Sequence, residues 1–223
     1  IRLSLVGSEM CIRDSIWGAA LIAFGRPGQE NLVRWLALIG SLVALVVTFP
    51  LYTAFHGGTA EMQFVENIAW IDRFNINYHL GIDGLSFWFV PLTAFVTVVV
   101  VIASWEVIKI RVNQYYGSFL VLSGLMIGVF CSMDGMLFYV FFEATLIPMY
   151  IIIGAWGGDN RIYAAFKFFL YTLMGSLLTL IAFIYLWHAS GGSFDILTWH
   201  QVKLGQTEPV SYTHLTLPTI LLV

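Results

Sequence analysis

Five segments of the chain are each long and apolar enough to cross a lipid bilayer, which takes about 20 residues of helix. Apart from one glutamate, they contain no Asp, Glu, Lys or Arg. Because lipid offers no hydrogen-bond partners, segments of this length satisfy their backbone groups as α-helices. A β-barrel would show shorter segments of alternating polarity, and these do not alternate. The predicted spans are Trp35–His56, Gly84–Trp105, Tyr115–Met133, Gly135–Trp156 and Phe168–Trp187.

The composition supports a membrane protein and argues against other classes. Hydrophobic residues make up 59% of the 223 residues and charged residues only 10%, whereas a soluble domain carries about 25% charged residues. The net charge of −3 gives no reason to expect nucleic acid as a partner. The two cysteines form no metal-ligand pattern, and no glycine-rich nucleotide-binding loop is found. We therefore predict an all-α integral membrane protein, a multi-span bundle of about five complete helices, with Ile16–Gly25 as the end of a partial first one.

The charges of the connecting segments predict how the helices are oriented, since cytoplasmic loops carry an excess of Lys and Arg. Basic residues gather in alternate connections, which lie on one side if each span crosses once. That side, with six basic residues against two, is predicted to be cytoplasmic, and the long loop 57–83 is predicted to be outside. The six are Arg26, Arg34, Lys109, Arg111, Arg161 and Lys167, and the two are Arg73 and Lys203.

Glu143 is the one charged residue inside the predicted spans. It lies eight residues from the start of Gly135–Trp156, on the order of 12 Å into a hydrocarbon core ~30 Å thick. An acidic side chain at this depth is costly and usually marks an ion path. Burial favours the neutral carboxyl, which makes a group that takes up and releases a proton near neutral pH. The alternative is a protonated glutamate that serves only to bond a neighbouring helix.

Two tyrosines and one lysine are candidate companions of Glu143. Tyr139 precedes it by four residues and Tyr150 follows it by seven, so the three share one stripe of a helix that could hold ordered waters. Lys167, near the inner end of the next span, either snorkels to the headgroups or faces the bundle as a charge partner or relay site. The Gly175–Ser176 pair predicts close helix packing only.

Two aspartates stand immediately before predicted spans, Asp83 and Asp134. A carboxylate at a helix N-terminus interacts favourably with the helix dipole and accepts hydrogen bonds from free backbone N–H groups. We predict that both cap and orient their helices. The histidines at the membrane edges and in the outer loops show no metal-ligand spacing.

Three strings between Asn75 and Trp187 resemble one known family. DGLSFWFVPLT, LFYVFFEATLIPMYIIIGAWGG and NRIYAAFKFFLYTL are similar to the M (chain 4) subunits of proton-pumping NADH:quinone oxidoreductase, respiratory complex I. These belong to the wider group of antiporter-like membrane subunits. The resemblance covers about half the chain strongly and the first spans more loosely.

The resemblance implies a fold and a role for particular residues. It implies the N-terminal part of a fourteen-helix subunit built from two inverted five-helix repeats, with a proton path along a central polar axis. Glu143 matches the family's essential glutamate, which pairs in the family with a lysine in a later, broken helix. That helix is not in this sequence. Lys167 matches a lysine commonly found at its position, with a less settled role.

The function implied is proton translocation, driven by quinone reduction elsewhere in the complex. The resemblance implies no cofactor in this chain, with NADH, FMN, iron–sulfur clusters and quinone on other subunits. The implied partners are other membrane subunits of the complex, the lipid bilayer and protons, and the implied location is a bacterial inner (plasma) membrane. The isolated chain is not expected to be active. The alternatives are a subunit of a cation/proton antiporter or membrane-bound hydrogenase complex, and a structural membrane subunit that does not pump.

The two ends do not resemble the family. LSLVGSEMCIRDS near the start and PVSYTHLTLPTILLV at the finish are similar to translated sequencing-adapter read-through. We therefore predict that residues 1–15 and 209–223 are not native and that residues 16–208 form a truncated antiporter-like transmembrane domain.

Overall fold

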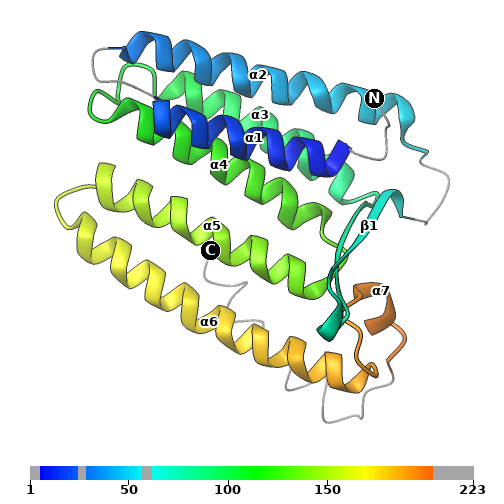
Figure 1. Ribbon diagram of the computed structural model, residues 1–223. Helices are drawn as coiled ribbons and strands as arrows, with labels where there is room; N and C mark the ends of the chain where they lie inside the picture. The colour runs from blue at the N-terminus through cyan, green and yellow to red at the C-terminus, as the bar shows by residue number, and fades with distance from the viewer. Residues whose placement is uncertain (1–5, 25–28, 57–61, 203–223) are drawn as a thin grey trace.

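The computed structural model describes residues 6–24, 29–56 and 62–202. This part of the chain folds as a bundle of long helices that lie side by side, with a β-hairpin and a short helix at one end (Figure 1). The long helices are α1 (Val6–Phe24), α2 (Glu30–Ala54), α3 (Ser86–Ala103), α4 (Val112–Cys131), α5 (Gly135–Trp156) and α6 (Arg161–Ala189). The short helix is α7 (Ile196–Trp199).

The predicted spans correspond to α2 through α6, each long and apolar enough to cross a membrane. The range Gly135–Trp156 coincides with α5 at both ends. The largest differences are at two N-termini, where α2 begins five residues earlier than predicted, at Glu30, and α6 seven residues earlier, at Arg161. Hydropathy does not register these first turns because they carry polar and charged residues, but backbone hydrogen bonding continues the helix through them.

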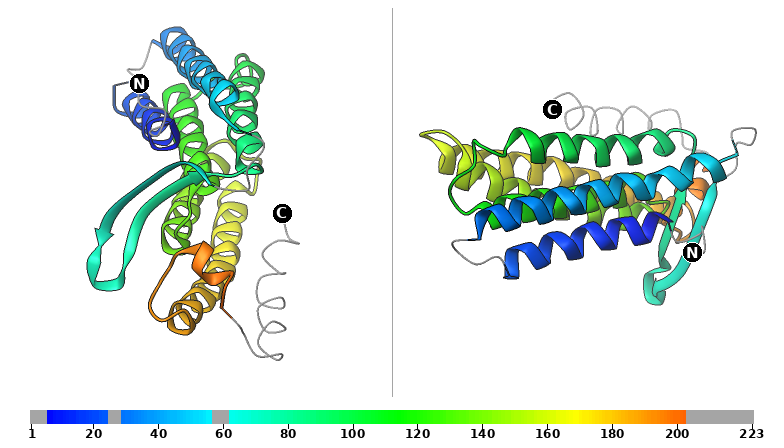
Figure 2. Two further views of the ribbon diagram at one scale, coloured as in Figure 1. Left: turned by 90° about the vertical axis from the view of Figure 1, so that its right-hand side faces the viewer. Right: turned by 90° about the horizontal axis from the view of Figure 1, so that it is seen from above.

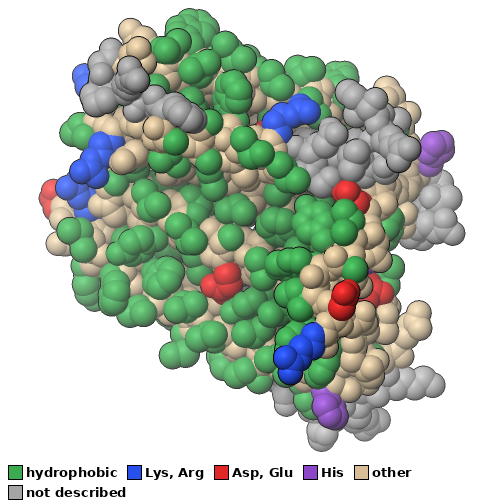
Figure 3. Space-filling view, in the orientation of Figure 1, with side chains coloured by type: hydrophobic (Ala, Val, Ile, Leu, Met, Phe, Trp, Pro, Cys, Tyr) green, Lys and Arg blue, Asp and Glu red, His purple; other side chains and the backbone are tan. Residues whose placement is uncertain are grey.

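Successive helices run in opposite directions, so their connections alternate between two ends of the bundle (Figure 1). The connections that contain residues 104–111 and 157–160 meet at one end, which we call the basic end. It carries Lys109 and Arg111, with Arg34 and Arg161 on the adjoining helix turns. Figure 3 shows basic side chains at this left-hand end of a face covered mainly by hydrophobic groups. Arg26 and Lys203 lie outside the described residues. The described basic residues lie at the ends of the bundle that the loop charges assigned to them, and the cytoplasmic location of the basic end stays a prediction.

The opposite end, which we call the hairpin end, differs from the sequence prediction. The segment predicted as a loop contains two antiparallel strands, β1 (Gln63–Ile71) and β2 (Ile76–Ile82), joined by the single 3-10 turn Asp72–Phe74. Asn75 completes the turn in the left-handed conformation, at φ 53°. The hairpin projects sideways from the helices (Figure 2). Its strands were not predicted because their hydrophobic residues do not alternate clearly, and the end of β2 is buried by contact with α4 and α5.

α4 lies at the centre of the described bundle and contacts α1, α2, α3 and α5. Its contact with α1 depends on glycine. A Cβ atom at Gly18 would lie 2.6 Å from the Gly117 carbonyl oxygen, and one at Gly117 would lie 2.7 Å from the Gly18 carbonyl oxygen. Small residues allow helix backbones to approach closely in membranes, where van der Waals packing drives association. α1 runs without interruption across Ser15, the predicted native boundary. That boundary stays a prediction, and residues 209–223 lie outside the described part.

Candidate functional site

The start of α5 is fixed at the hairpin end by Asp134, which is 2% exposed. Its Oδ1 accepts hydrogen bonds from the backbone N–H groups of Met136 (2.9 Å) and Leu137 (3.1 Å), which confirms the predicted cap. Its Oδ2 accepts a third, from the N–H of Asn77 on β2 (3.3 Å). A single carboxylate therefore joins the helix to the hairpin. Asp83 also bonds the start of its helix, by accepting a hydrogen bond from the N–H of Ser86, the first residue of α3, at 2.6 Å, but it lies two residues before the cap position, which Leu85 occupies.

The other end of α5 is held by Trp156. Its indole Nε1–H donates a hydrogen bond to the Ile110 carbonyl oxygen in the α3–α4 connection, at 2.8 Å. Its ring meets Tyr115 edge to face, with centroids 5.2 Å apart. The same connection is bonded from α2, where Arg34 Nη2 donates to the Ile108 carbonyl oxygen at 2.9 Å. Both ends of α5 are thus attached to other elements, which sets the depth of the residues between them.

Glu143 lies on the first half of α5, on the order of 12 Å from the hairpin-end start of the helix. Its side chain is half-buried, but Oε1 is fully enclosed and accepts no hydrogen bond. A buried ionised carboxyl without partners is very costly, so such a group is stable when protonated or when water or a cation joins it. The structure therefore places on the first half of α5 an acid with one enclosed oxygen that has no hydrogen-bond partner among the described residues.

Tyr139 lies one helical turn before Glu143 on α5 and is half-buried, so these two members of the predicted stripe share a face of the helix. Tyr150 is 38% exposed and meets Phe169 of α6 ring to ring at 5.7 Å. Ser176, which the sequence assigned to helix packing, is 3% exposed, and its hydroxyl donates a hydrogen bond to the Leu173 carbonyl oxygen of its own helix at 2.9 Å.

Lys167 lies on the face of α6 opposite to the buried Ser176. It is exposed, and its Nζ sits 5.9 Å from the centre of the Tyr163 ring. Lys167 and Ser176 are nine residues apart, which at 100° per residue puts them on opposite faces of the helix. Within the described part of the chain, no ion pair joins Lys167 to Glu143. Its role as a charge partner or relay site stays a prediction.

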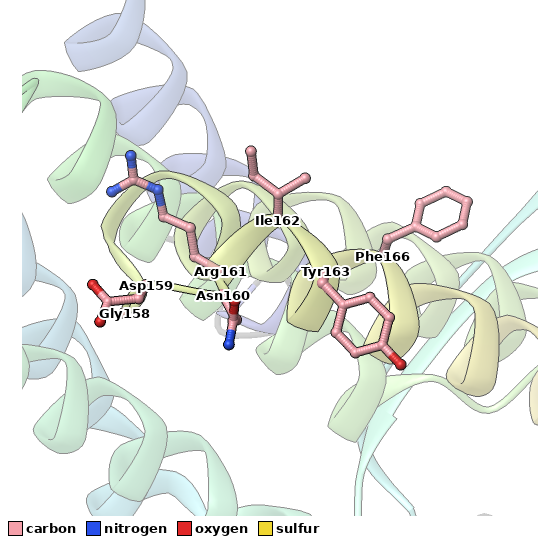
Figure 4. A pocket seen from close by; sticks show the side chains of 8 residues that line it. Gly158, Asp159, Asn160, Arg161, Ile162, Tyr163 and Phe166 are labelled. Carbon is pink, nitrogen blue, oxygen red and sulfur yellow. The ribbon is translucent and has the colours of Figure 1, made fainter.

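The remaining candidate features do not form a site. Among the described residues, no group of three or more His, Cys, Asp or Glu side chains is arranged to hold a metal ion. A hollow of about 760 Å³ lies at the α5–α6 turn, at the basic end and far along α5 from Glu143. Figure 4 shows that the side chains around it, among them Asp159, Arg161 and Tyr163, point in different directions instead of converging.

Comparison with known families divides the chain into two adjoining matches. Residues 32–132 match the family described as NADH-ubiquinone oxidoreductase chain 4, amino terminus. Residues 132–223 match the family described as NADH:quinone oxidoreductase/Mrp antiporter, TM. Over 172 residues the chain is 47% identical to NADH-quinone oxidoreductase subunit M of Rhodobacter capsulatus, a match that covers 77% of this chain and 33% of the relative.

Solved structures share the fold. Respiratory complex I from Thermus thermophilus with bound NADH contains a chain 27% identical to this one, with a TM-score of 0.75, covering 91% of this chain and 40% of that one. The Mrp complex from Dietzia contains another, 17% identical, with a TM-score of 0.69, covering 86% of this chain and 20% of that one. The chain spans about a third of the length of the curated relative described above. It belongs to the family of antiporter-like membrane subunits that includes NADH-quinone oxidoreductase subunit M and NADH-ubiquinone oxidoreductase chain 4.

Proposed function

We propose that this chain is part of a proton-translocating membrane subunit of NADH:quinone oxidoreductase, in which Glu143 takes up and releases the transported proton. Quinone reduction elsewhere in the complex would drive the change in its protonation through electrostatic coupling. Membership of the family supports the assignment to this complex, and the burial of Glu143 supports the choice of this residue as the proton carrier.

The observation that carries the proposal is the enclosed Oε1 of Glu143, which accepts no hydrogen bond. A carboxyl that served only as a structural link between helices would place both oxygens on fixed donors, as Asp134 does. An enclosed carboxyl oxygen without a donor is left for a water molecule or a proton to join, because no existing hydrogen bond has to break first. This is the behaviour that proton transfer requires of a mid-membrane group.

We propose that the redox cofactors are held elsewhere. NADH, FMN, the iron–sulfur clusters and quinone would be bound by other subunits, and this chain would contribute proton transfer to the oxidoreductase as a whole. Its partners would be the neighbouring membrane subunits of the complex. Since the relative from Rhodobacter capsulatus is bacterial, we propose the bacterial inner membrane as the location of this chain, with the basic end in the cytoplasm.

A second candidate is a subunit of a cation/proton antiporter or membrane-bound hydrogenase complex. The fold likeness to the Mrp complex favours it, whereas the higher identity to NADH-quinone oxidoreductase subunit M favours the first proposal. The genes beside the coding sequence would separate the two, since each complex has its own set of partner subunits.

The test is Glu143→Gln in the full-length subunit within the intact complex, measured as proton pumping by inverted membrane vesicles during NADH oxidation. Glutamine keeps the size of the side chain but cannot exchange a proton, so pumping attributable to this subunit should be lost. Glu143→Asp should retain part of it. Glu106→Gln, an exposed glutamate in the α3–α4 connection, is the matched control and should pump like the wild type.

Normal pumping by the Glu143→Gln complex would refute the proposal. A structural membrane subunit predicts a different pattern, in which Glu143→Gln lowers the amount of assembled complex while each assembled complex pumps normally. Native gels of the same membranes report assembly, so the two results are distinguishable.

A further inference from the structure

The chain turns back on itself immediately after α6, at the hairpin end. Gly191 and Gly192 have positive φ angles, 77° and 97°, which reverse the direction of the backbone at little steric cost. Residues 190–199, which we call the strap, contain this turn and end in the short helix α7. Figure 1 shows α7 at the same end of the bundle as the β-hairpin.

Backbone hydrogen bonds hold the strap against the turn between α4 and α5. The Gly135 N–H donates to the Phe194 carbonyl oxygen at 2.8 Å, and the Ile196 N–H donates to the Met133 carbonyl oxygen at 3.0 Å. The two bonds form a short antiparallel bridge between the strap and the start of α5. Since these are main-chain groups, replacing a side chain of the strap leaves them available to bond.

Four aromatic rings pack together where the strap meets α6, and we call them the aromatic plug. They are Phe183 and Trp187 of α6 and Phe194 and Trp199 of the strap. The centroid of the Trp199 ring lies 5.2 Å from that of Phe183 and 6.3 Å from that of Phe194. Phe194 is 6% exposed and stacks on Trp187 at 5.9 Å. The Trp199 ring also lies directly on the start of α5, since a Cβ atom at Gly135 would collide with it.

The plug lies between Glu143 and the hairpin end, along the contact of α5 with α6 that we call the α5–α6 seam. Phe183 also contacts Phe138 of α5, with centroids 6.3 Å apart. Phe138 is five residues before Glu143 and hence about 7.5 Å nearer the start of the helix. Beyond Glu143, Tyr150 contacts Phe169 of α6. Contacts across the seam therefore occur on both sides of the acid, and toward the hairpin end the seam continues into the plug.

We propose that the aromatic plug seals the α5–α6 seam against water from the hairpin end, so that Glu143 does not exchange protons directly with that side along the seam. Closely packed rings leave no room for a water molecule and offer it few hydrogen-bond partners. A constriction of apolar side chains closes a path by excluding water. The seal itself does not depend on the proposed function, but its meaning for proton transfer rests on it.

The test measures aqueous access to the seam of the intact complex from the hairpin side, in right-side-out membrane vesicles. Cysteine replaces one of two small buried residues of α6, either Ala182 beside the plug, 4% exposed, or Ser176 further in, 3% exposed. A membrane-impermeant cationic methanethiosulfonate reagent is added outside, and peptide mass spectrometry gives the rate of labelling. Both cysteines should react slowly. His188→Cys, at an exposed position one residue beyond Trp187, should react fast, which shows that the reagent reaches this end.

Truncating the plug should open this route. Trp199→Ala should speed the labelling of the cysteine at position 182 by about tenfold or more, because the lost ring leaves a cavity next to the end of the seam. Adding Phe183→Ala should extend the faster labelling to the cysteine at position 176. Phe166→Ala is the matched control, since it removes an exposed ring of α6 near the basic end, and it should leave both rates unchanged.

If the Trp199→Ala complex fails to assemble, Phe194→Ala serves in its place with the same expectation. Fast labelling at position 182 with the plug intact, or an unchanged rate after the plug is truncated, would overturn the inference. The readout is labelling and not pumping, so neither result decides the role of Glu143. Normal pumping by Glu143→Gln would refute the proposed function and leave the seal in place, without its meaning for proton transfer.

Discussion

α4 and α6 are both predicted from the same kind of apolar sequence, but they occupy opposite environments. Ten of the 20 residues of α4 are buried, whereas only three of the 29 residues of α6 are. α4 has helices around it and presents small residues to them. α6 packs chiefly against α5 and leaves a wide apolar face uncovered, including Tyr171, Met174 and Ile181.

This difference in burial matches a difference in role: α4 packs against its neighbours, whereas the candidate functional side chains lie on α5 and α6. The central helix α4 carries no Asp, Glu, Lys or Arg and serves to bring its neighbours together. The ionisable and hydrogen-bonding groups of interest lie on α5 and α6, at the edge of the described bundle. An apolar face as wide as that of α6 is stable against lipid or against further protein. Side chains on this edge of the bundle can therefore contact other helices or subunits, whereas those of the enclosed α4 cannot.

The largest expected contrast comes from truncating one isoleucine on each helix. Ile127 on α4 is 0% exposed and Ile181 on α6 is 61% exposed. Ile127→Ala should lower the free energy of unfolding by about 3 kcal/mol, since it leaves a cavity among packed neighbours. Ile181→Ala should change it by less than about 0.5 kcal/mol. Thermal or denaturant unfolding of the chain in detergent micelles, followed by circular dichroism, measures both.

Equal losses for the two alanine variants would break the comparison, because they would mean that the outer face of α6 is packed in this chain. Repeating the measurement in the full-length subunit sharpens it. There, a larger loss for Ile181→Ala would show that another helix covers this face.

A smaller contrast is expected from adding bulk. Gly117→Val places methyl groups where the backbone of α1 approaches, near Gly18 and Ile22, and should cost about 2 kcal/mol by separating the two helices. Ala164→Val on α6 is the matched substitution at an exposed position and should cost about 0.5 kcal/mol or less, from helix propensity. The unfolding midpoint of each variant in the same detergent reports the difference. A Gly117→Val protein as stable as Ala164→Val would contradict the close α1–α4 contact.

The smallest effect is expected at Lys167. Because its side chain is exposed and its described contact is the Tyr163 ring, Lys167→Gln should change the free energy of unfolding of this chain by no more than about 0.5 kcal/mol. The same unfolding assay applies, with Lys109→Gln in the α3–α4 connection as control. A loss well above 1 kcal/mol for Lys167→Gln alone would place a partner for its charge inside this bundle.

Much of the fold follows from the sequence because membrane insertion imposes strong local rules. Apolar length fixed the positions of α2 through α6, and loop charge predicted which ends lie together. The hydrogen bonds of Asp83 and Asp134 to the starts of their helices were predicted because a carboxylate before a helix has a local role. The hairpin was missed because its strands lack clear alternation and are stabilised by pairing with each other and by contact with the ends of α4 and α5.

The candidate site likewise has features that follow from local sequence and features that depend on how helices pack. Glu143 stood out in the sequence by itself, since an uncompensated acid in a 22-residue apolar helix is costly wherever the helix packs. The exposure of Lys167 and Tyr150 and the burial of Ser176 depend on the rotation of α6 against α5. Periodicity gives which residues share a face of one helix, but only the packing of two helices decides which faces meet. The sequence thus determined the spans and the acid, and the tertiary structure decided which faces of α5 and α6 are buried between the two helices.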